Sequence, residues 1–578
     1  MNMKRRIFLI LFLGLAIVSI SRAYCLGPKI SLPAKFQDLH IAEKLTYSNS
    51  PFNYFISDSQ DNASHYVNVL NNGDDALLAR LHLIRQAQKS ILIKTFIWKT
   101  DETSRLIAYE LIKAAKRGVK VKIIIDSFTL PKKLHLITLL TVAHPNIEVK
   151  LYNPVSRNAA SSKIDLVKKT LFNFRSLNQR MHNKAFIIDD RIGITGGRNY
   201  ENDYYDRGNK RNFKDCDVLA IGPVVKEMTD SFREYWSYPL SVWSKDMRDI
   251  QSLIESDRYK QYLPQEGREF KSMFEELWAC EADKQCIKQR LIDTSYKVKG
   301  VKFVTDSPGK RLRMGKYNVT RTTHELYRFL EQAQDYIIMQ TPYLIIGNKC
   351  AKYFKQLAGK KPKVEFFVSS NSLASADHVH AYAFSYKNKK EYLNSFRWQI
   401  FELKLLPEDA DLMITPIKKE QRHKDYITCI HSKIYVVDGK KTWIGSFNLD
   451  PRSANLNTES GVIIDDEKLA QDTEKNIRRD MAGQNSWVIG RRKQVPVIDQ
   501  FSGLIGSVMK LMPVADIWPF VYSGSFELKP EKPAVPFFHK DFYTNYKYIG
   551  PFPKVQSTEK EIKTRLIKAF FGPIQPLI

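Results

Sequence analysis

The sequence predicts an α/β protein made of two similar lobes, each a mixed or parallel sheet flanked by helices, that form a pseudo-twofold pair with one shared active site. Two windows, HNKAFIIDD and HSKIYVVDG, share a pattern and are each followed by a glycine-containing turn and an asparagine. A strand, a helix and a further strand are expected before each window. The 43% of hydrophobic residues can fill real cores, which excludes disordered, collagen-like and simple coiled-coil chains.

The first strand, helix and strand are expected at residues 90–98, 103–117 and 119–125. Gly118 is a natural C-cap for that helix. The equivalent elements before the second window are expected at 335–343, 349–359 and 364–368. This order, repeated, favours parallel pairing within each lobe.

The chain divides by composition into five segments. We expect a signal peptide or an uncleaved anchor, two lobes, a charged helical insert or linker between them, and a basic, aromatic C-terminal extension. In order, these segments are 1–23, 50–245, 246–299, 300–500 and 501–578, with the insert third.

The N-terminus has the features of an export signal. Lys4, Arg5 and Arg6 precede an apolar run over 7–20, and Ala23 ends a short segment that a signal peptidase could cleave. We therefore expect an exported protein, on the periplasmic side of a bacterial membrane or attached to it. No later segment is long and apolar enough to suggest another membrane span.

The net charge is +28, from 90 Lys and Arg against 62 Asp and Glu. Such a surplus favours polyanionic partners, either nucleic acid or the phosphates of a membrane, although a general effect on solubility remains an alternative. The extension around 565–571 could lie on an anionic bilayer or pack as an ordinary terminal helix. None of the six cysteines forms a CxxC pair, so no metal site is predicted, and the spacing of Cys280 and Cys286 leaves their pairing open.

The two windows coincide at every marked offset. Counted from the histidine, each has a lysine at +2, an aspartate at +7, a glycine at +14 and an asparagine at +17. These residues are His182, Lys184, Asp189, Gly196 and Asn199 in the first copy, and His431, Lys433, Asp438, Gly445 and Asn448 in the second. Strands at 185–188 and 434–437 are expected to anchor each His and Lys on one face.

This residue set suits phosphoryl chemistry. Lysine ammonium and asparagine amide groups donate hydrogen bonds to phosphate oxygens, and imidazole can attack phosphorus or move a proton near neutral pH. Two histidines on opposite sides of one phosphorus allow in-line displacement. No cofactor or metal is needed, because the Lys and Asn groups neutralise the phosphate charge.

A nucleophilic histidine needs a carboxylate on its other ring nitrogen. The segment at Glu459 aligns with the segment at Asp215, so we expect Glu459 to orient His431 and Asp215 to orient His182, each within its own lobe. Asp217 is a less favoured substitute for Asp215. For the motif residues Asp189 and Asp438, a structural role is as plausible as a direct role in catalysis.

These motifs resemble the phospholipase D superfamily, and most of all the C-type branch of bacterial cardiolipin synthases. The similarity lies in RMHNKAFIID with GGRN, DVLAIGPVV, SNSLASAD and GSFNLDPRSANLNTESG, and it covers most of 50–500. It implies two αβ lobes around one site and a phosphohistidine intermediate, with His182 as nucleophile and His431 as acid and base. The insert at 246–299, the C-terminal extension and the single N-terminal apolar run depart from the family pattern.

The resemblance implies transfer of a phosphatidyl group onto the glycerol headgroup of phosphatidylglycerol, which gives cardiolipin. The expected partners are phospholipid substrates and an anionic membrane surface, and the sequence leaves protein partners unknown. Hydrolysis to phosphatidic acid, by a phospholipase D with water as acceptor, uses the same catalytic residues. A secreted nuclease and a non-catalytic phosphate-binding module are further alternatives. The export signal argues against the nuclease and nucleic acid, and the complete motifs argue against the binding module.

Overall fold

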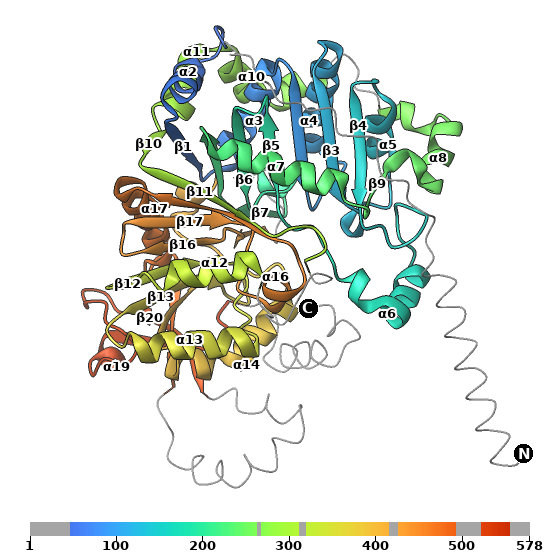
Figure 1. Cartoon of the computed structure of the whole chain (residues 1–578). Helices are drawn as coiled ribbons and strands as arrows, with labels where there is room; N and C mark the ends of the chain where they lie inside the picture. Colours follow the sequence, from blue (N-terminus) through green and yellow to red (C-terminus); the bar gives the residue numbers. More distant parts are fainter. Residues whose placement is uncertain (1–46, 263–267, 311–319, 416–425, 493–521, 555–578) are drawn as a thin grey trace, which may run out of the picture.

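The computed structural model describes residues 47–262, 268–310, 320–415, 426–492 and 522–554 (Figure 1). The predicted signal segment 1–23 and the terminal segment 565–571 lie outside these ranges. Within them the chain forms the two-lobed α/β fold that the sequence predicts.

The first lobe contains a nine-stranded mixed sheet. Its order is β10 (Tyr296–Val298), β1 (His65–Leu70), β8 (Asp217–Ile221), β6 (Ile192–Gly196), β5 (Ala185–Ile188), β2 (Ser90–Thr95), β3 (Lys120–Asp126), β4 (Ile147–Tyr152) and β9 (Ser241–Trp243). Strands β2, β3 and β4 are parallel to one another, and β5 runs antiparallel to β2. The expected parallel pairing within the first lobe is therefore present.

The second lobe repeats this order in a ten-stranded sheet. The strands are β11 (Gly300–Thr305), β18 (Ser460–Asp465), β17 (Lys441–Gly445), β16 (Ile434–Val437), β12 (Tyr336–Gln340), β13 (Glu365–Asn371), β14 (Trp398–Leu403), β19 (Ser486–Arg491), β20 (Ser523–Leu528) and β21 (Tyr546–Gly550). The run from β8 to β4 in the first sheet matches the run from β18 to β14 in the second. Strands β12, β13 and β14 are again parallel.

Helices cover the face of each sheet that points away from the other lobe (Figure 1). In the first lobe these are α3 (Gly73–Gln86), α4 (Glu102–Lys116) and α5 (His135–Val142), and in the second α12 (Arg321–Leu330), α13 (Asn348–Lys360) and α14 (Val379–Asn394). The side chains of Asp101 and Thr320 cap the N-termini of α4 and α12 by accepting from backbone N–H groups.

The two lobes meet through an apolar core that both supply. It includes Ile187 and Val218 from the first sheet and Ile444 and Val462 from the second, all at most 1% exposed. Helices α7 (Val224–Ser237) and α17 (Glu467–Met481) contribute side chains to the same core from equivalent places after β8 and β18. Burial of this apolar surface fixes how the lobes face each other.

Two expected boundaries differ in the structure. The segment 246–299 does not stand apart as a linker, because its helices α8 (Arg248–Glu255), α9 (Arg268–Met273), α10 (Glu275–Ala282) and α11 (Lys284–Ile287) pack into the core of the first lobe. A disulfide joins Cys280 to Cys286 in that segment. The second lobe does not end at residue 500, because β20 and β21 extend its sheet.

Among the residues that the structure describes, no helix is both long and apolar enough to cross a membrane.

Candidate active site

Both motif histidines lie where the two lobes meet. His182 immediately precedes the segment leading into β5, and His431 lies between β15 (Ile427–Ile430) and β16. The backbone N–H of His182 donates to Thr458 O of the second lobe at 3.0 Å, and that of His431 donates to Lys214 O of the first lobe at 2.8 Å. The backbone of each lobe therefore holds the histidine of the other.

The residue before each histidine is fixed by a side chain of its own lobe. Asp126, at the end of β3, accepts from Met181 N at 2.7 Å. Asn371, at the end of β13, bonds both the N–H and the carbonyl of Ile430 at 2.8 Å. Because parallel strands bring their carboxyl ends to one edge of a sheet, both histidines are held at the same kind of edge in their lobes.

The orienting carboxylates pair with the histidines across the lobes, and not within them as the sequence suggested. Nδ1 of His182 lies 2.8 Å from Oε2 of Glu459, and Nδ1 of His431 lies 2.5 Å from Oδ2 of Asp215. The expected pairs Glu459 with His431 and Asp215 with His182 are therefore wrong. The residues are the expected ones, but the face-to-face packing of the lobes carries each carboxylate to the opposite histidine.

The strand register explains why Asp215 and Glu459 are equivalent. Gly196 pairs with Asp217, and Gly445 pairs with Gly461, so each carboxylate lies two residues before the paired position. The glycine turns allow close approach, since a Cβ atom at Gly197 would lie 2.1 Å from Oδ1 of Asp215. Any larger residue at 197 would displace this carboxylate.

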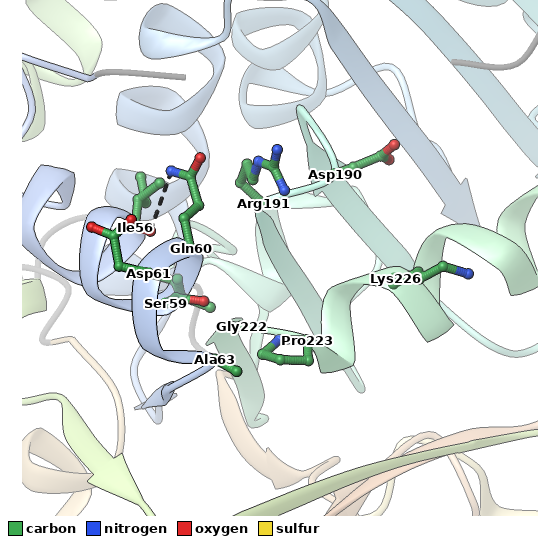
Figure 2. Close-up of a pocket in the computed structure, with 11 residues that line it drawn as sticks. Ile56, Ser59, Gln60, Asp61, Ala63, Asp190, Arg191, Gly222, Pro223 and Lys226 are labelled. Carbon is green, nitrogen blue, oxygen red and sulfur yellow. Dashed lines mark hydrogen bonds between the residues drawn. The ribbon is translucent and has the colours of Figure 1, made fainter. Parts of the chain in front are cut away.

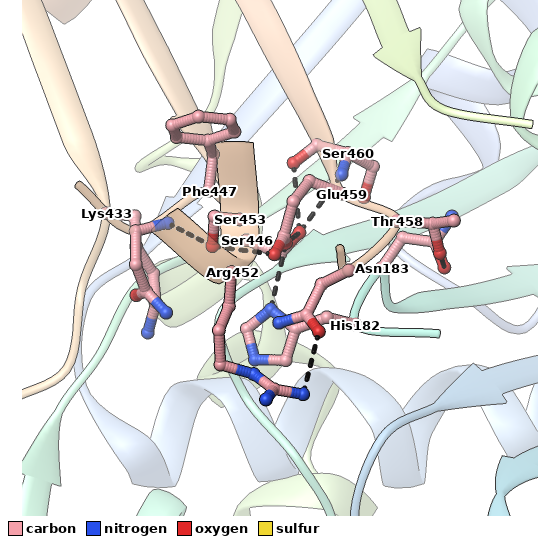
Figure 3. A network of polar contacts seen from close by, with 12 residues as sticks. His182, Asn183, Lys433, Ser446, Phe447, Arg452, Ser453, Thr458, Glu459 and Ser460 are labelled. Atoms are coloured by element: carbon pink, nitrogen blue, oxygen red, sulfur yellow. Dashed lines mark hydrogen bonds and ion pairs between the residues drawn. The ribbon is translucent and has the colours of Figure 1, made fainter. Parts of the chain in front are cut away.

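Glu459 is held by two hydroxyl groups besides the imidazole. Ser446 Oγ donates to its Oε2 at 2.5 Å, and Ser453 Oγ donates to its Oε1 at 2.8 Å. Figure 3 shows this carboxylate between the two serines and the ring of His182. Both Glu459 oxygens are thus occupied, and the His182 ring has one preferred orientation.

Both histidines are neutral in the free protein. Burial lowers the pKa of His182 to about 4 against the pull of Glu459, and burial together with Lys433 lowers the pKa of His431 to about 4. Burial alone would raise the pKa of the two carboxyls, but the neighbouring imidazole and lysine groups hold both below their usual values, that of Asp215 at about 2. A neutral ring that donates from Nδ1 to a carboxylate leaves its Nε2 lone pair available.

The motif lysines lie beside their histidines. Lys184 Nζ donates to His182 O at 2.6 Å. Lys433 Nζ donates to His431 O and lies 2.7 Å from Nδ1 and 3.3 Å from Nε2 of the His431 ring. Burial lowers the pKa of Lys184 to about 7 and that of Lys433 to about 8, and the charge of Lys433 also lowers the pKa of Lys184. The two motifs therefore share one electrostatic environment, in which a bound anion would favour the charged form of both lysines.

The two motif asparagines differ in their partners. Asn199 accepts from Ile97 N at 3.1 Å and donates to the Tyr204 hydroxyl at 2.9 Å, and this hydroxyl lies 3.5 Å from Nε2 of His431. Asn448 is 5% exposed, and its Oδ1 has no hydrogen-bond partner among the described residues. Asn199 thus reaches the histidine of the other lobe through Tyr204.

Asp189 and Asp438 lie away from the histidines, at the far ends of β5 and β16. Asp189 accepts from the backbone N–H groups of residues 88, 89 and 90 at 2.6 to 2.8 Å, and Asp438 accepts from those of 334, 335 and 336 at 2.8 to 2.9 Å. Each fixes the start of the neighbouring parallel strand, which favours the structural role over a direct role in catalysis. Asp217 also has a structural role, because it pairs with buried Arg80 at 2.8 Å.

Three residues of this site are not predicted by the sequence motifs. Tyr204 lies outside every quoted motif, so only its contacts reveal it, whereas Ser453 lies within the quoted motif GSFNLDPRSANLNTESG. Asp377 follows β13, its side chain is 6% exposed, and it accepts from the Tyr343 hydroxyl at 2.8 Å. Its Oδ1 has no partner among the described residues, and its charge favours the protonated forms of His431 and Lys433. The quoted motif SNSLASAD ends on this residue, which was the available signal.

No cluster of His, Cys, Asp and Glu among the described residues could hold a metal ion. A cavity of about 510 Å³ lies between α2 (Asn53–Asn62), the turn after β5 and the start of α7 (Figure 2). It includes Asp190 and Arg191 and is at the opposite end of β5 from His182. It therefore contains none of the motif histidines, lysines or asparagines.

The arrangement supplies two neutral imidazoles with carboxylates behind them, two lysines of lowered pKa and two buried amides at one seam between the lobes. Such a set can bind a phosphodiester anion, form a bond from nitrogen to phosphorus and move protons at the attacking and leaving oxygens.

Comparison with known proteins gives one family. A family model described as "Cardiolipin synthase, PLD-like domain" matches residues 81–236 and 326–481, one range in each lobe. An uncharacterized protein of Helicobacter pylori is 32% identical over 465 residues, 77% of this chain and 86% of that protein. Cardiolipin synthase C of Escherichia coli K12 is 29% identical over 440 residues, 72% of this chain and 86% of the other. The crystal structure of a phosphatidylserine synthase from Haemophilus influenzae aligns with a TM-score of 0.48 at 14% identity, over 81% of this chain and 100% of that one.

Proposed function

Because the chain belongs to the phospholipase D-like cardiolipin synthase family, we propose that it makes cardiolipin by moving a phosphatidyl group through a phosphohistidine. The matched domain occurs twice, so the chain is a phosphatidyltransferase-type enzyme of this family with both halves of its motif intact. The acceptor we propose is the glycerol headgroup of phosphatidylglycerol.

The observation that carries the proposal is the pair of crossed contacts between histidine and carboxylate. Each contact orients one neutral imidazole, so one ring is ready to attack and the other to transfer protons. Two such rings serve the two displacements of a transferase, in which one alcohol leaves before another enters.

In the first displacement, Lys184, Lys433 and Asn448 bind the phosphodiester of the donor lipid. Nε2 of His182 attacks phosphorus, a P–N bond forms, and the P–O bond to the donor headgroup breaks. The leaving oxygen takes a proton from Nε2 of His431. His431 can donate this proton because it is protonated when substrate is bound: the negative charge of the phosphodiester raises the pKa of the imidazole above its value in the free site.

In the second displacement, a hydroxyl of the acceptor gives its proton to Nε2 of His431. Its oxygen attacks phosphorus and the P–N bond breaks, which returns His182 to its neutral form. Excluding water from this step separates transfer from hydrolysis.

The contacts favour His182 over His431 as the nucleophile. Nε2 of His431 lies near the Tyr204 hydroxyl and Lys433 Nζ, whereas no group among the described residues is hydrogen-bonded to Nε2 of His182. A lone pair without a competing donor is the better nucleophile, and a ring next to a hydroxyl is suited to proton transfer.

We also propose that the protein works outside the cytoplasm at an anionic membrane. The disulfide between Cys280 and Cys286 supports an oxidising compartment, in agreement with the expected export signal. The net charge of +28 supports attraction to anionic lipid.

Lipid products test the proposed reaction. The purified full chain is incubated with vesicles containing labelled phosphatidylglycerol and phosphatidylethanolamine, and the products are resolved. Cardiolipin supports the proposal, and phosphatidic acid alone would show a hydrolase. If lipids remain intact while DNA is cleaved, the protein is a nuclease.

The intermediate can be trapped with a donor that needs no general acid. With phosphatidyl-p-nitrophenol, the His431→Ala variant should release one equivalent of nitrophenol and retain the phosphatidyl group on the protein, because the base for the second step is absent. The His182→Ala variant should release none. Equal label on both variants would contradict a phosphohistidine at His182.

A further inference from the structure

Helix α6 (Lys163–Leu177) carries an apolar stripe that no described part of the chain covers. Ile164, Val167 and Leu171 are 67%, 58% and 72% exposed, which is unusual for three large apolar residues on one helix. At about 100° per residue they fall within about 60° of the helix circumference. In Figure 1 this helix stands out from the first lobe, beside the junction of the lobes.

Two exposed lysines border the stripe. By the same helical geometry, Lys163 and Lys168 each lie about 40° from its edges, on opposite sides. Long lysine stems beside an apolar face let the ammonium groups reach phosphate while the apolar side chains enter lipid. Over residues 163–177 the helix has three Lys and one Arg against one Asp, a positive surplus that complements anionic headgroups.

The opposite side of α6 is tied to the body of the first lobe. Lys169 Nζ donates to Pro154 O at 3.1 Å, and Asn153 Nδ2 donates to the carbonyls of Ser176 and Gln179 at 2.7 and 2.8 Å. The exposed stripe is thus fixed in direction, and it is not the result of a frayed helix.

The helix is also next to the catalytic seam in the chain. It ends five residues before His182, and Asn178 in this short segment accepts from Arg452 of the second lobe at 3.1 Å. A surface that holds α6 would therefore lie near the site where phosphodiesters react.

The second lobe exposes apolar residues in the equivalent connection. The chain from β4 to His182 contains α6, and the chain from β14 to His431 contains α15 (Ala410–Met413), with Leu406 and Leu412 exposed at 63% and 65%. Five of the eleven large apolar side chains that are exposed in the described ranges thus come from these two connections. Both connections begin at the carboxyl edge of parallel strands, where the histidines lie.

We propose that the α6 stripe (Ile164, Val167 and Leu171) docks the enzyme on an anionic phospholipid bilayer and brings the headgroups of substrate lipids to the seam between the lobes. The inference rests on the proposed lipid substrate and extends it by naming the surface that meets the membrane. The occupant is lipid, because paired lysines beside an apolar stripe complement a layer of phosphates over acyl chains.

A local crosslink tests this without interference from other membrane contacts. Photoreactive benzoylphenylalanine replaces Val167 in the full chain, and vesicles of phosphatidylglycerol and phosphatidylethanolamine carry a trace of radiolabelled phosphatidylglycerol. The same probe at Tyr54, which is 67% exposed on α2, is the matched control. We expect at least about tenfold more lipid label at 167 than at 54, and a decrease in zwitterionic vesicles or high salt. Equal lipid label, or a crosslink at 167 only to a second copy or to the chain itself, would overturn the proposal.

An activity ratio separates docking from chemistry. We compare turnover of vesicle lipid with turnover of bis-p-nitrophenyl phosphate, a soluble phosphodiester, in the Ile164→Gln, Val167→Gln, Leu171→Gln triple variant. The ratio of vesicle to soluble turnover should fall at least about tenfold, because three apolar side chains no longer enter lipid. The Tyr54→Gln, Met273→Gln variant should keep the wild-type ratio. An unchanged ratio in the triple variant contradicts docking by α6. A wild-type protein that is inactive on both substrates refutes the proposed enzyme, and docking is then judged by the crosslink alone.

Discussion

The crossed pairing predicts that each carboxylate acts on the histidine of the other lobe. We consider Glu459→Gln and Asp215→Asn, which keep the size of each side chain and remove its charge. The first substitution weakens the hydrogen bond between Glu459 and His182 at 2.8 Å, and the second weakens the one between Asp215 and His431 at 2.5 Å. Both carboxylates are buried, so water cannot take their place.

The magnitude follows from the strength of a charge-assisted hydrogen bond. Such a bond contributes about 1.5 to 3 kcal/mol, and about 1.4 kcal/mol corresponds to a tenfold change in rate. Each variant should therefore slow the step of its own histidine roughly 10- to 150-fold. Glu459→Gln should lie toward the upper end, because Ser446 and Ser453 also lose a charged acceptor.

The assay is rapid-mixing release of nitrophenol from phosphatidyl-p-nitrophenol. Formation of the phosphohistidine gives the initial burst, and its transfer to the acceptor gives the slower steady rate. Glu459→Gln should slow the burst, as His182→Ala abolishes it. Asp215→Asn should keep the burst and slow the steady rate, as His431→Ala does.

Double variants complete the test. Adding Glu459→Gln to His182→Ala should change little, because the carboxylate acts only through the ring that is gone. Thermal unfolding of each variant controls for loss of the fold. If Glu459→Gln instead behaves like His431→Ala, and Asp215→Asn like His182→Ala, the pairing across the lobes is refuted.

Three further predictions follow from the contacts and pKa values. Asp189→Ala and Asp438→Ala should each lower the free energy of unfolding by about 1 to 3 kcal/mol, because backbone donors lose their acceptor. The activity per folded molecule should stay within about threefold of the wild type. Denaturant titration measures the stability, and active-site titration gives the activity per folded molecule. The native pKa of about 4 at His182 and at His431 lies below the unfolded value of about 6.5. Between these pH values the unfolded chain therefore binds more protons than the native protein. The free energy of unfolding should fall as the pH decreases from about 6.5 to 4, by up to about 3 kcal/mol per histidine. Unfolding curves of His182→Asn across this range should show a smaller pH dependence than those of the wild type, and an equal dependence would contradict the assignment. Asp377→Asn should lower the pKa of His431 and Lys433, so the profile of kcat/KM against pH should shift toward lower pH, and a shift in the opposite direction would contradict the contact.

The duplicated motif made most of the catalytic set predictable. The offsets from His182 and His431 identified the lysines and asparagines, and the aligned segments identified Asp215 and Glu459. Their partners could not be predicted, because pairing within a lobe and pairing across lobes use the same residues. Only the relative orientation of the two sheets decides between them.

Other features depended on contacts that have no sequence signature. Tyr204 belongs to the site because its hydroxyl accepts a hydrogen bond from Asn199 and lies 3.5 Å from Nε2 of His431. The sequence predicts a separate extension where strands β20 and β21 lie, because the segment is rich in proline and aromatic residues and follows the last repeated element. In the structure β20 nevertheless pairs with the free edge of β19, and β21 pairs with β20.

The exchange of carboxylates has a consequence for how such a chain could arise. One lobe alone would contain an imidazole without its carboxylate acceptor and a carboxylate without its imidazole, so it would lack a complete histidine–carboxylate pair. A single-lobe ancestor could have been competent only as a homodimer, in which each copy completed the other. In the fused chain the two halves depend on each other, because a substitution at residue 215 or 459 in one lobe impairs the histidine of the other lobe.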